Sequence, residues 1–419
     1  MQIFNNNYPC CTGDNQRVSS YRTSGQRQKR GLWFFRFLLL VLPLFFQGIL
    51  FPQLESLYKS GTIKMVVDSS FGSQTDWENQ FYDMYKSMTM APDGSLFISN
   101  SRQHNITKIS ATGQVVKTFG QKGQGTSDVT SPHHLSILDQ KYLVVGESPL
   151  LRRISLFKLD GKFSQIIRTN HECYFPQALK DSRIVYYSIL SDNTNVKKYT
   201  VWIKDVITGI EIKVVSVELL TKDKLRPDKN TLIYIGNHWG ELILKQTGDG
   251  NVLVGISNQP DINIYSPQGK WLRSFRLNIT PLSVTSTYIR DYKQLILEDF
   301  ASTRDGRPSL DIIKKASFSE LIPSTLPYYR QIVVDSAGNI LVFRWLDCVR
   351  GGMEKFLVYS ATGNFINEVL LDTGQFEVEI DYRWENLLFT NSGIFAYVPL
   401  KNNEDSNPRI IKIKVPDKQ

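Results

Sequence analysis

Short apolar runs alternate with polar turns along this chain, and a similar turn returns seven times between residues 93 and 385. Most of these turns follow one another at about 42 to 47 residues, and the step between residues 182 and 250 is longer. A period in this range is typical of stacked supersecondary units, and four short strands per unit predict an all-β fold, a β-propeller. The turns are Asp93-Gly94, Asp139-Gln140, Asp181-Ser182, Asp249-Gly250, Asp291-Tyr292, Ala337-Gly338 and Trp384-Glu385.

The first unit shows the pattern most clearly, with strands expected at residues 86–90, 95–99, 106–110 and 115–119. Its turns contain Gly94 and Gly113, which adopt the positive φ that tight hairpins require. The last unit supplies only three strands. Residues 62–67, an apolar run far away in sequence, are expected to form its outer strand and to close the ring.

The repeat predicts seven four-stranded blades. Six is the alternative, and it applies if residues 294–313 or residues 216–245 do not form a separate sheet. The fifth unit lacks the second glycine, and the long step near residue 216 indicates an insertion.

The N-terminal region predicts a membrane anchor. Residues 1–30 form a polar, basic tail, residues 31–51 are apolar enough for one transmembrane helix, residues 52–61 form a linker, and residues 62–419 form the propeller. Positive charge before the span predicts a cytoplasmic N-terminus and a periplasmic or extracellular propeller. A cleaved signal peptide is the alternative to a retained signal anchor, but residues 46–48 and 59–61 match poorly the small-residue pattern that a cleavage site needs.

The net charge of +9 does not indicate a nucleic-acid partner. The first 36 residues hold six basic side chains and one acidic side chain, Asp14, so much of the excess lies in the tail. The rest of the chain is nearly balanced and has no basic stripe with interleaved aromatic residues.

One stretch carries a resemblance to a known family. Residues 90–100 (MAPDGSLFISN), residues 119–125 (FGQKGQG) and the Ser131-Pro132-His133 run together resemble an NHL repeat, and are similar to exported six-bladed propeller proteins of bacteria. This resemblance implies a protein, peptide or sugar partner, or less often a lyase or hydrolase with a metal in the central channel. The family's usual aspartate after the second strand is replaced by Asn100 and Glu147 here, which leaves that residue's role open.

Three histidines are the candidate metal ligands. His134, His171 and His238 lie near the start of the innermost strand in three successive units, so their imidazoles could converge on a divalent cation in the channel. The alternative is that each histidine is packed or solvent-facing. No other cofactor is expected.

Four acidic residues are expected at the ends of second strands. Paired carboxylates could perform acid–base chemistry or hold calcium, but capping of the adjoining loop is the favoured role. The residues are Glu147, Glu298, Asp299 and Asp347. Cys173 and Cys348 fall three units apart, so no disulfide is expected between them.

Aromatic residues near strand ends suggest a binding surface. His238 and Trp239 end an insertion that could project from one face, and Trp345 follows a strand, so these three are the candidate ligand-binding residues. Packing between blades is the competing role.

The sequence favours a non-catalytic binding or scaffold module for a protein, peptide or glycan. The alternative is a channel-metal lyase or hydrolase of the NHL or gluconolactonase-like type. The fold alone does not decide between them.

Overall fold

The computed structural model of the chain describes residues 52–64, 66–72, 85–123, 125–191, 196–220, 224–225, 233–234, 240–302, 314, 317–344, 354–372, 387–390, 393–398 and 409–414. They belong to one compact unit, Phe51–Gln419. The predicted tail and span, residues 1–51, lie outside the described ranges. Within those ranges no helix has the length and hydrophobicity needed to cross a membrane.

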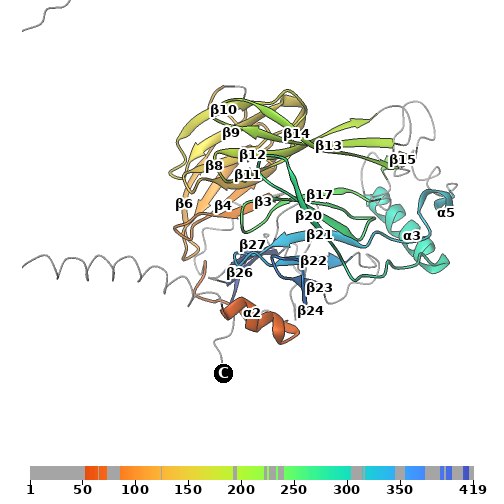
Figure 1. The fold of residues 1–419 in the computed structure, drawn as a ribbon. Coiled ribbons are helices and arrows are strands. Elements are labelled where there is room, and N and C mark those ends of the chain that lie inside the picture. Colours follow the sequence, from red (N-terminus) through yellow and green to blue (C-terminus); the bar gives the residue numbers. More distant parts are fainter. Residues whose placement is uncertain are drawn as a thin grey trace, which may run out of the picture. The chain divides into compact units, whose positions relative to one another are not determined.

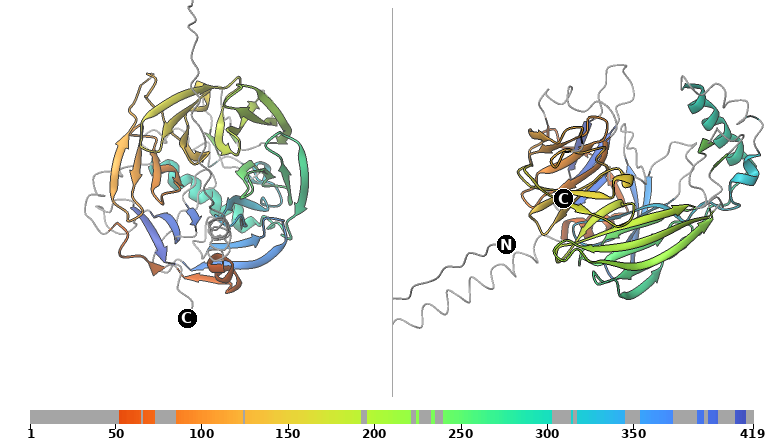
Figure 2. Two further views of the ribbon diagram at one scale, coloured as in Figure 1. Left: turned by 60° about the vertical axis from the view of Figure 1, so that its left-hand side comes forward. Right: turned by 90° about the horizontal axis from the view of Figure 1, so that it is seen from above.

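The described strands form six antiparallel sheets of the propeller kind, arranged around a centre (Figure 1; Figure 2, left). Blade 1 contains β3 (Tyr85–Met90), β4 (Leu96–Asn100), β5 (Asn105–Ile109) and β6 (Val115–Phe119). Blade 2 contains β7 (His134–Leu138), β8 (Tyr142–Gly146), β9 (Arg153–Lys158) and β10 (Phe163–Arg168). Blade 3 contains β11 (Tyr174–Leu179), β12 (Arg183–Ser191), β13 (Val196–Asp205) and β14 (Glu211–Leu220).

The remaining three blades follow in chain order. Blade 4 contains β17 (Leu242–Gln246), β18 (Val252–Ile256), β19 (Asp261–Tyr265) and β20 (Trp271–Arg276). Blade 5 contains β21 (Tyr329–Val334), β22 (Ile340–Arg344), β23 (Glu354–Tyr359) and β24 (Phe365–Asp372). Blade 6 contains β25 (Leu387–Thr390), β26 (Gly393–Val398) and β27 (Arg409–Lys414). The fold is a six-bladed β-propeller.

The prediction of seven blades is therefore wrong. Residues expected to form the fifth unit include helix α3 (Ser286–Ser302), followed by the short helix α5 (Phe318–Leu321). Tyr288 and Tyr292 lie one helical turn apart and stack on each other at 5.9 Å between ring centroids, and Phe318 packs against Tyr292. Side chains of α3, α5 and the residues around them pack into a small apolar core of their own in place of the expected sheet.

Residues 216–245, the second region that could have formed a separate sheet, also form no blade among the described residues. β14 extends blade 3 to Leu220, and the described part of residues 221–241 contains the two-residue strands β15 (Lys224–Leu225) and β16 (Ile233–Tyr234), which pair with each other. The long step in the repeat is thus an extended hairpin and an insertion.

Ring closure follows the prediction for residues 66–67 and differs from it for residues 62–64. β2 (Val66–Val67) pairs antiparallel with β27 and supplies the outer strand of blade 6. β1 (Thr62–Lys64) pairs parallel with β24 and becomes a fifth strand of blade 5. One short segment therefore ties two neighbouring blades together.

The segment expected to be a linker contains helix α2 (Pro52–Lys59), which packs on blade 5. Leu54 and Tyr58 are buried in the same apolar cluster as Phe356. The Tyr58 hydroxyl donates a 2.8 Å hydrogen bond to the carboxylate of Asp335.

Four of the predicted turns lack glycine, and in two of them both residues adopt positive φ. Asp139 and Gln140 have φ of 49° and 56°, and Asp181 and Ser182 have φ of 60° and 53°. Aspartate is among the residues that tolerate this region best. The Ser182 hydroxyl donates to Asp139 across 2.5 Å, so the turns of blades 2 and 3 support each other.

Candidate functional site in the central channel

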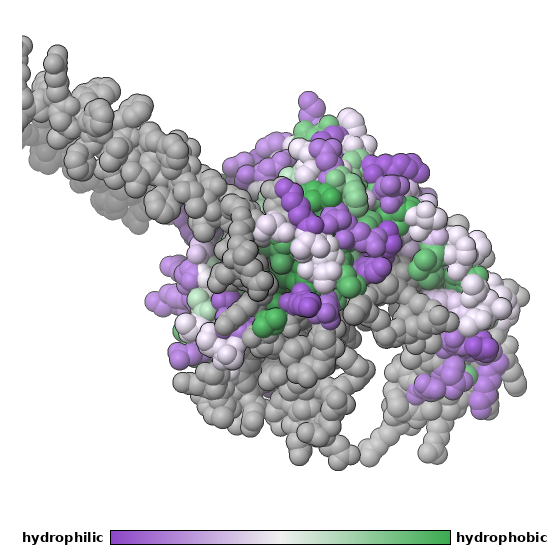
Figure 3. Space-filling model, turned by 90° about the horizontal axis from the view of Figure 1, so that it is seen from below, coloured by the Kyte–Doolittle hydropathy of each residue, from purple (hydrophilic) through white to green (hydrophobic). Residues whose placement is uncertain are grey.

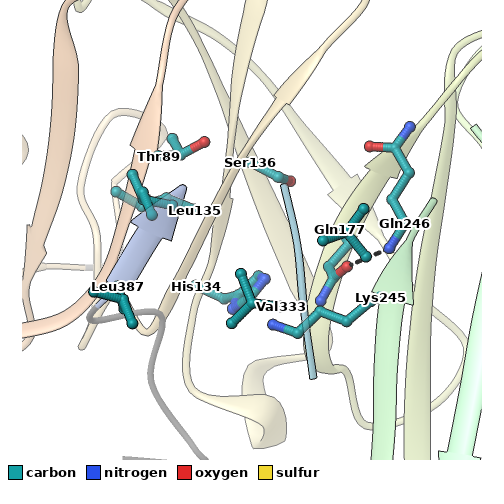
Figure 4. A pocket seen from close by; sticks show the side chains of 11 residues that line it. Thr89, His134, Leu135, Ser136, Gln177, Lys245, Gln246, Val333 and Leu387 are labelled. Carbon is teal, nitrogen blue, oxygen red and sulfur yellow. Dashed lines mark hydrogen bonds between the residues drawn. The ribbon is translucent and has the colours of Figure 1, made fainter. Parts of the chain in front are cut away.

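A cavity of about 190 Å³ lies where the innermost strands of all six blades meet. Each blade contributes at least one lining residue, which identifies the cavity as part of the central channel (Figure 4). The lining residues are Thr89, His134, Leu135, Ser136, Gln177, Lys245, Gln246, Val333, Val334, Leu387 and Leu388.

Side chains of inner strands bridge to the backbone of the next blade. The Ser87 hydroxyl accepts the Leu135 N–H at 3.1 Å, and the Ser136 hydroxyl accepts the Ala178 N–H at 2.9 Å. Inner strands expose one edge to the channel, and these bonds satisfy backbone groups that would otherwise lack a partner there.

Gln177 makes a similar bridge from blade 3 to blade 4. Its side-chain carbonyl accepts the Gln246 N–H at 3.0 Å, and its amide donates to the Leu244 carbonyl at 2.7 Å. Both ends of the amide are held, so Gln177 presents a fixed polar group to the cavity.

His134 and Lys245 are the two basic side chains in the cavity wall. His134 is only 2% exposed and lies edge-on to Phe175, with 5.8 Å between ring centroids. Lys245 comes from β17, and its ammonium end is directed toward the region where His134 and Val333 lie (Figure 4). Sequence reasoning found His134 but missed Lys245, although its place in the apolar run of an inner strand was a usable signal.

The other predicted site residues do not join His134 in the described cavity wall. His171 stacks on Trp202, with 4.1 Å between ring centroids and 16° between planes, and it does not line the cavity. His238, Trp239 and Trp345 lie outside the described residues. Among the residues that the structure describes, no group of three histidine, cysteine or acidic side chains is arranged to hold a metal ion.

Glu147 is held in a buried ion pair. Its carboxylate accepts bonds from Arg153 at 2.9 and 2.6 Å and from the Ser155 hydroxyl at 2.6 Å. It also accepts the Thr130 N–H at 2.7 Å, which fixes the loop between blades 1 and 2. The prediction of loop capping is confirmed for this residue.

The other acidic candidates lie elsewhere. Glu298 and Asp299 are part of α3, so the prediction that they end a second strand is wrong. Asp347 lies outside the described residues. Cys173 is buried, and burial raises the pKa of its thiol well above the usual value, so this cysteine stays protonated and is a poor nucleophile.

The outer surface carries one group of exposed apolar side chains on neighbouring turns. Ile207 and Ile210 flank the turn before β14 and are 80% and 59% exposed, and Trp271 and Leu272 begin β20. A Cβ placed on Gly269 would lie 3.3 Å from the Ile212 side chain, so the turn before β20 lies close to the start of β14. We call Ile207, Ile210, Trp271 and Leu272 the rim patch. On the face drawn in Figure 3, hydrophobic and hydrophilic side chains are interspersed.

Comparison with known proteins supports the fold and leaves the function open. No model of a known protein family matches the sequence, and no curated protein matches it. A solved member of the DUF4221 family from Bacteroides vulgatus is similar, with 12% identity and a TM-score of 0.50, covering 80% of this chain and 93% of that chain.

Two further solved structures are less similar in fold. A putative exported protein from Bacteroides fragilis has 11% identity and a TM-score of 0.47, covering 85% of this chain and 99% of that chain. Virginiamycin B lyase from Staphylococcus aureus has 11% identity and a TM-score of 0.37, covering 78% of each chain. At such identities the likeness concerns the fold alone.

Proposed function

We propose that this protein is a membrane-anchored propeller, displayed in the periplasm or outside the cell, that binds a protein, peptide or glycan partner without catalysing a reaction. The observation that carries this proposal is the rim patch. Tryptophan is enriched among the residues that dominate binding energy, and grouped exposed apolar side chains are typical of interaction sites.

The contacts of Glu147, a candidate for acid–base chemistry, and of His171, a candidate metal ligand, support a non-catalytic role. The Glu147 carboxylate is paired with the Arg153 guanidinium and also accepts hydrogen bonds from the Ser155 hydroxyl and the Thr130 N–H. A carboxylate held in this way is poorly suited to exchange protons with a substrate. The imidazole ring of His171 packs face to face on the indole ring of Trp202. The ion pair of Glu147 and the ring stack of His171 are structural contacts that explain where these two side chains lie.

The anchoring part of the proposal rests on the sequence and on α2. Residues 31–51 have the length and hydrophobicity of a membrane span, and basic residues precede them. α2 begins at Pro52 and is packed on blade 5 through Leu54 and Tyr58. α2 therefore follows the predicted span directly in the sequence.

Site-specific photo-crosslinking in the native cells tests the partner. A photoreactive residue replaces Leu272 in the rim patch, and a matched variant carries it at Val116, which is exposed on the outer strand of blade 1. We expect a discrete adduct from position 272 that disappears when Trp271→Ala is added, and no such adduct from position 116. Equal adducts at both positions, or none at either, would contradict the proposed surface.

The second candidate function is a channel-metal lyase or hydrolase of the NHL or gluconolactonase-like type. The observation in its favour is that His134 lines the central cavity. Elemental analysis of the purified full chain distinguishes the two functions. Stoichiometric metal that is lost in each of His134→Ala, His171→Ala and His238→Ala would favour the enzyme, whereas the binding module is expected to show none.

A further inference from the structure

We infer that the rim patch binds a segment of a protein partner in which aspartate or glutamate flanks aliphatic or aromatic side chains. This inference rests on the proposed function and names the chemistry of its partner. The rim patch lies where the β13–β14 hairpin of blade 3 approaches the β19–β20 hairpin of blade 4. The charged and the apolar side chains of these two hairpins both indicate what the partner carries.

Two lysines flank the rim patch. Lys270 directly precedes Trp271 in the sequence. Lys213 follows Ile212, whose side chain would lie 3.3 Å from a Cβ placed on Gly269. Both lysines are exposed, and neither forms an ion pair in the part of the chain that the structure describes. Each lysine therefore offers its ammonium group to a partner.

The acidic side chains of the same two hairpins are already paired. Every aspartate and glutamate of residues 196–220 and 261–276 lies beside a basic side chain of this protein. The pairs are Asp205 with Arg183 at 3.7 Å, Glu211 with Lys204 at 3.4 Å, Glu218 with Lys198 at 3.1 Å and Asp261 with Arg276 at 3.3 Å. Arg183 is shared with Asp181 of the β11–β12 turn, also at 3.7 Å. The charges of Lys213 and Lys270 are therefore not neutralised from within these hairpins.

A third basic group lies on the blade 5 side of the patch. Arg273 follows Trp271 by two residues, and its guanidinium donates to the backbone carbonyls of Ala361 and Thr362 rather than to a carboxylate. The outer turns of blades 2 to 5, which surround the patch, all belong to the described residues: 159–162, 206–210, 266–270 and 360–364. This part of the surface therefore carries an excess of positive charge, which acidic side chains of a partner would complement.

The apolar side chains of the rim patch select against a carbohydrate or a simple anion. Ile207 and Ile210 are branched aliphatic side chains, 80% and 59% exposed, and covering them is favourable when the partner brings apolar surface of its own. An acidic glycan would complement the two lysines but would place hydroxyl groups against these isoleucines. An acidic segment that also carries leucine, isoleucine, valine or phenylalanine complements both parts of the surface.

Photo-crosslinking in the native cells, with the photoreactive residue at position 272, tests the role of charge. The double variant Lys213→Glu/Lys270→Glu is expected to lower the yield of the adduct about 10-fold, because complementary charge speeds association. Lys122→Glu/Lys141→Glu makes the same change of net charge at two exposed lysines outside blades 3 and 4, and it is expected to leave the yield unchanged. An adduct that the first double variant leaves unchanged overturns this inference and leaves the proposed surface intact, whereas the absence of any adduct in the parent overturns both.

Two short labelled peptides test the chemistry of the partner in solution. They share the same leucine and phenylalanine residues, which are flanked by glutamate in one peptide and by lysine in the other, and oligogalacturonate is the acidic glycan probe. Fluorescence polarisation with the full chain in a non-ionic detergent measures binding. The glutamate peptide is expected to bind at least about 10-fold more tightly than either other probe and to lose affinity as the salt concentration rises.

Further variants distinguish the rim patch from unspecific attraction and from a folding defect. Trp271→Ala is expected to weaken binding of the glutamate peptide about 10-fold, because it removes the aromatic surface. Lys213→Arg/Lys270→Arg keeps both charges and is expected to retain binding. The inference is overturned if the glutamate peptide does not bind, if the lysine peptide or oligogalacturonate binds as tightly, or if Trp271→Ala or Lys213→Glu/Lys270→Glu leaves its affinity unchanged.

Discussion

Asp335 and Asp205 occupy equivalent places in two hairpins, but their surroundings differ. Asp335 directly follows β21, and Asp205 is the last residue of β13. One oxygen of each carboxylate accepts backbone N–H groups of the turn: Ala337 and Asn339 for Asp335, Ile207 and Thr208 for Asp205. Asp335 is 3% exposed, and burial raises its pKa above the ordinary value despite these bonds and that from Tyr58. The backbone bond from Thr208 holds the pKa of the more open Asp205 below that value.

These opposite shifts predict opposite effects of pH on stability. A raised pKa in the folded state means that Asp335 contributes most stability below its unfolded pKa of 3.8, and that this contribution is lost as pH rises through the folded pKa. The stability of the parent relative to Asp335→Asn should therefore fall as pH rises above about 4. Urea unfolding at a series of pH values measures this difference.

The matched variant is Asp205→Asn. Its lowered folded pKa means that the stabilising contribution is present above 3.8 and is lost as pH falls through the folded value. The parent's advantage over Asp205→Asn should stay constant above about pH 5 and shrink in acid. If both variants show the same trend with pH, the pKa values of Asp335 and Asp205 are not shifted in opposite directions.

Some of the residue-scale detail could be predicted from the sequence. The position of Glu147 at the end of a second strand predicted that it fixes a loop, but its partners, Thr130, Arg153 and Ser155, are not its immediate neighbours in sequence, and the buried ion pair with Arg153 was not predicted. The stack of His171 on Trp202 joins a residue of the connection between β10 and β11 to a residue of β13, 31 positions later, and no local pattern indicates which ring will be the partner. The lining of the cavity likewise depends on which inner-strand side chains turn inward in blades far apart in sequence.

At the scale of strands, side chains of the inner strands connect blade 1 to blade 2, blade 2 to blade 3 and blade 3 to blade 4. Ser87 and Ser136 occupy the same role in blades 1 and 2, and each receives an N–H from the following inner strand. Because these groups lie at the junction of two sheets, the bonds help set the spacing of the blades around the channel.

Removing either hydroxyl should destabilise the ring. Ser87→Ala and Ser136→Ala leave the N–H groups of Leu135 and Ala178 without these acceptors, which is expected to cost about 1 to 3 kcal/mol each. Ser274→Ala, on the exposed outer strand of blade 4, is the control and should change stability by less than about 0.5 kcal/mol. Denaturant unfolding measures all three, and equal small effects would show that the bridges contribute nothing.

The fifth repeat unit is where the predicted elements differ most from the structure, because it contains helix α3 in place of strands. The polar pair Asp291-Tyr292 falls at the interval of the repeat and so predicts strands in the fifth unit. Tyr288, Tyr292 and Ile296 recur every four residues, which is the spacing of a helix face, and they join the buried or partly buried core around α3 and α5. The regular spacing of the repeat outweighed the local pattern, and the blade count rose by one.

For the whole molecule, the period of the repeat was sufficient to predict a closed ring. The partner of each blade is its neighbour in sequence, except at the closure, where residue 62 meets residue 370 and residue 66 meets residue 414. The apolar character of residues 62–67 predicted that closure. Its division between two blades could not be predicted, because pairing with β24 and with β27 needs the same kind of short apolar strand.

This division makes blades 5 and 6 depend on one short segment. Ile63 is 1% exposed and packs in a cluster with Val369 and Leu371 of blade 5 and with Ile394 and Ile413 of blade 6. Ile63→Ala removes apolar contacts with both blades and should cost about 2 to 5 kcal/mol. It should also speed amide hydrogen exchange in β24 and β27 together, since loosening β1 releases β2 beside it, while β6 and β10 keep their protection. Lys64→Ala is the control, because that neighbouring side chain is exposed. Faster exchange in β24 alone would mean that the two halves of the segment act independently and that the ring is not closed as one unit.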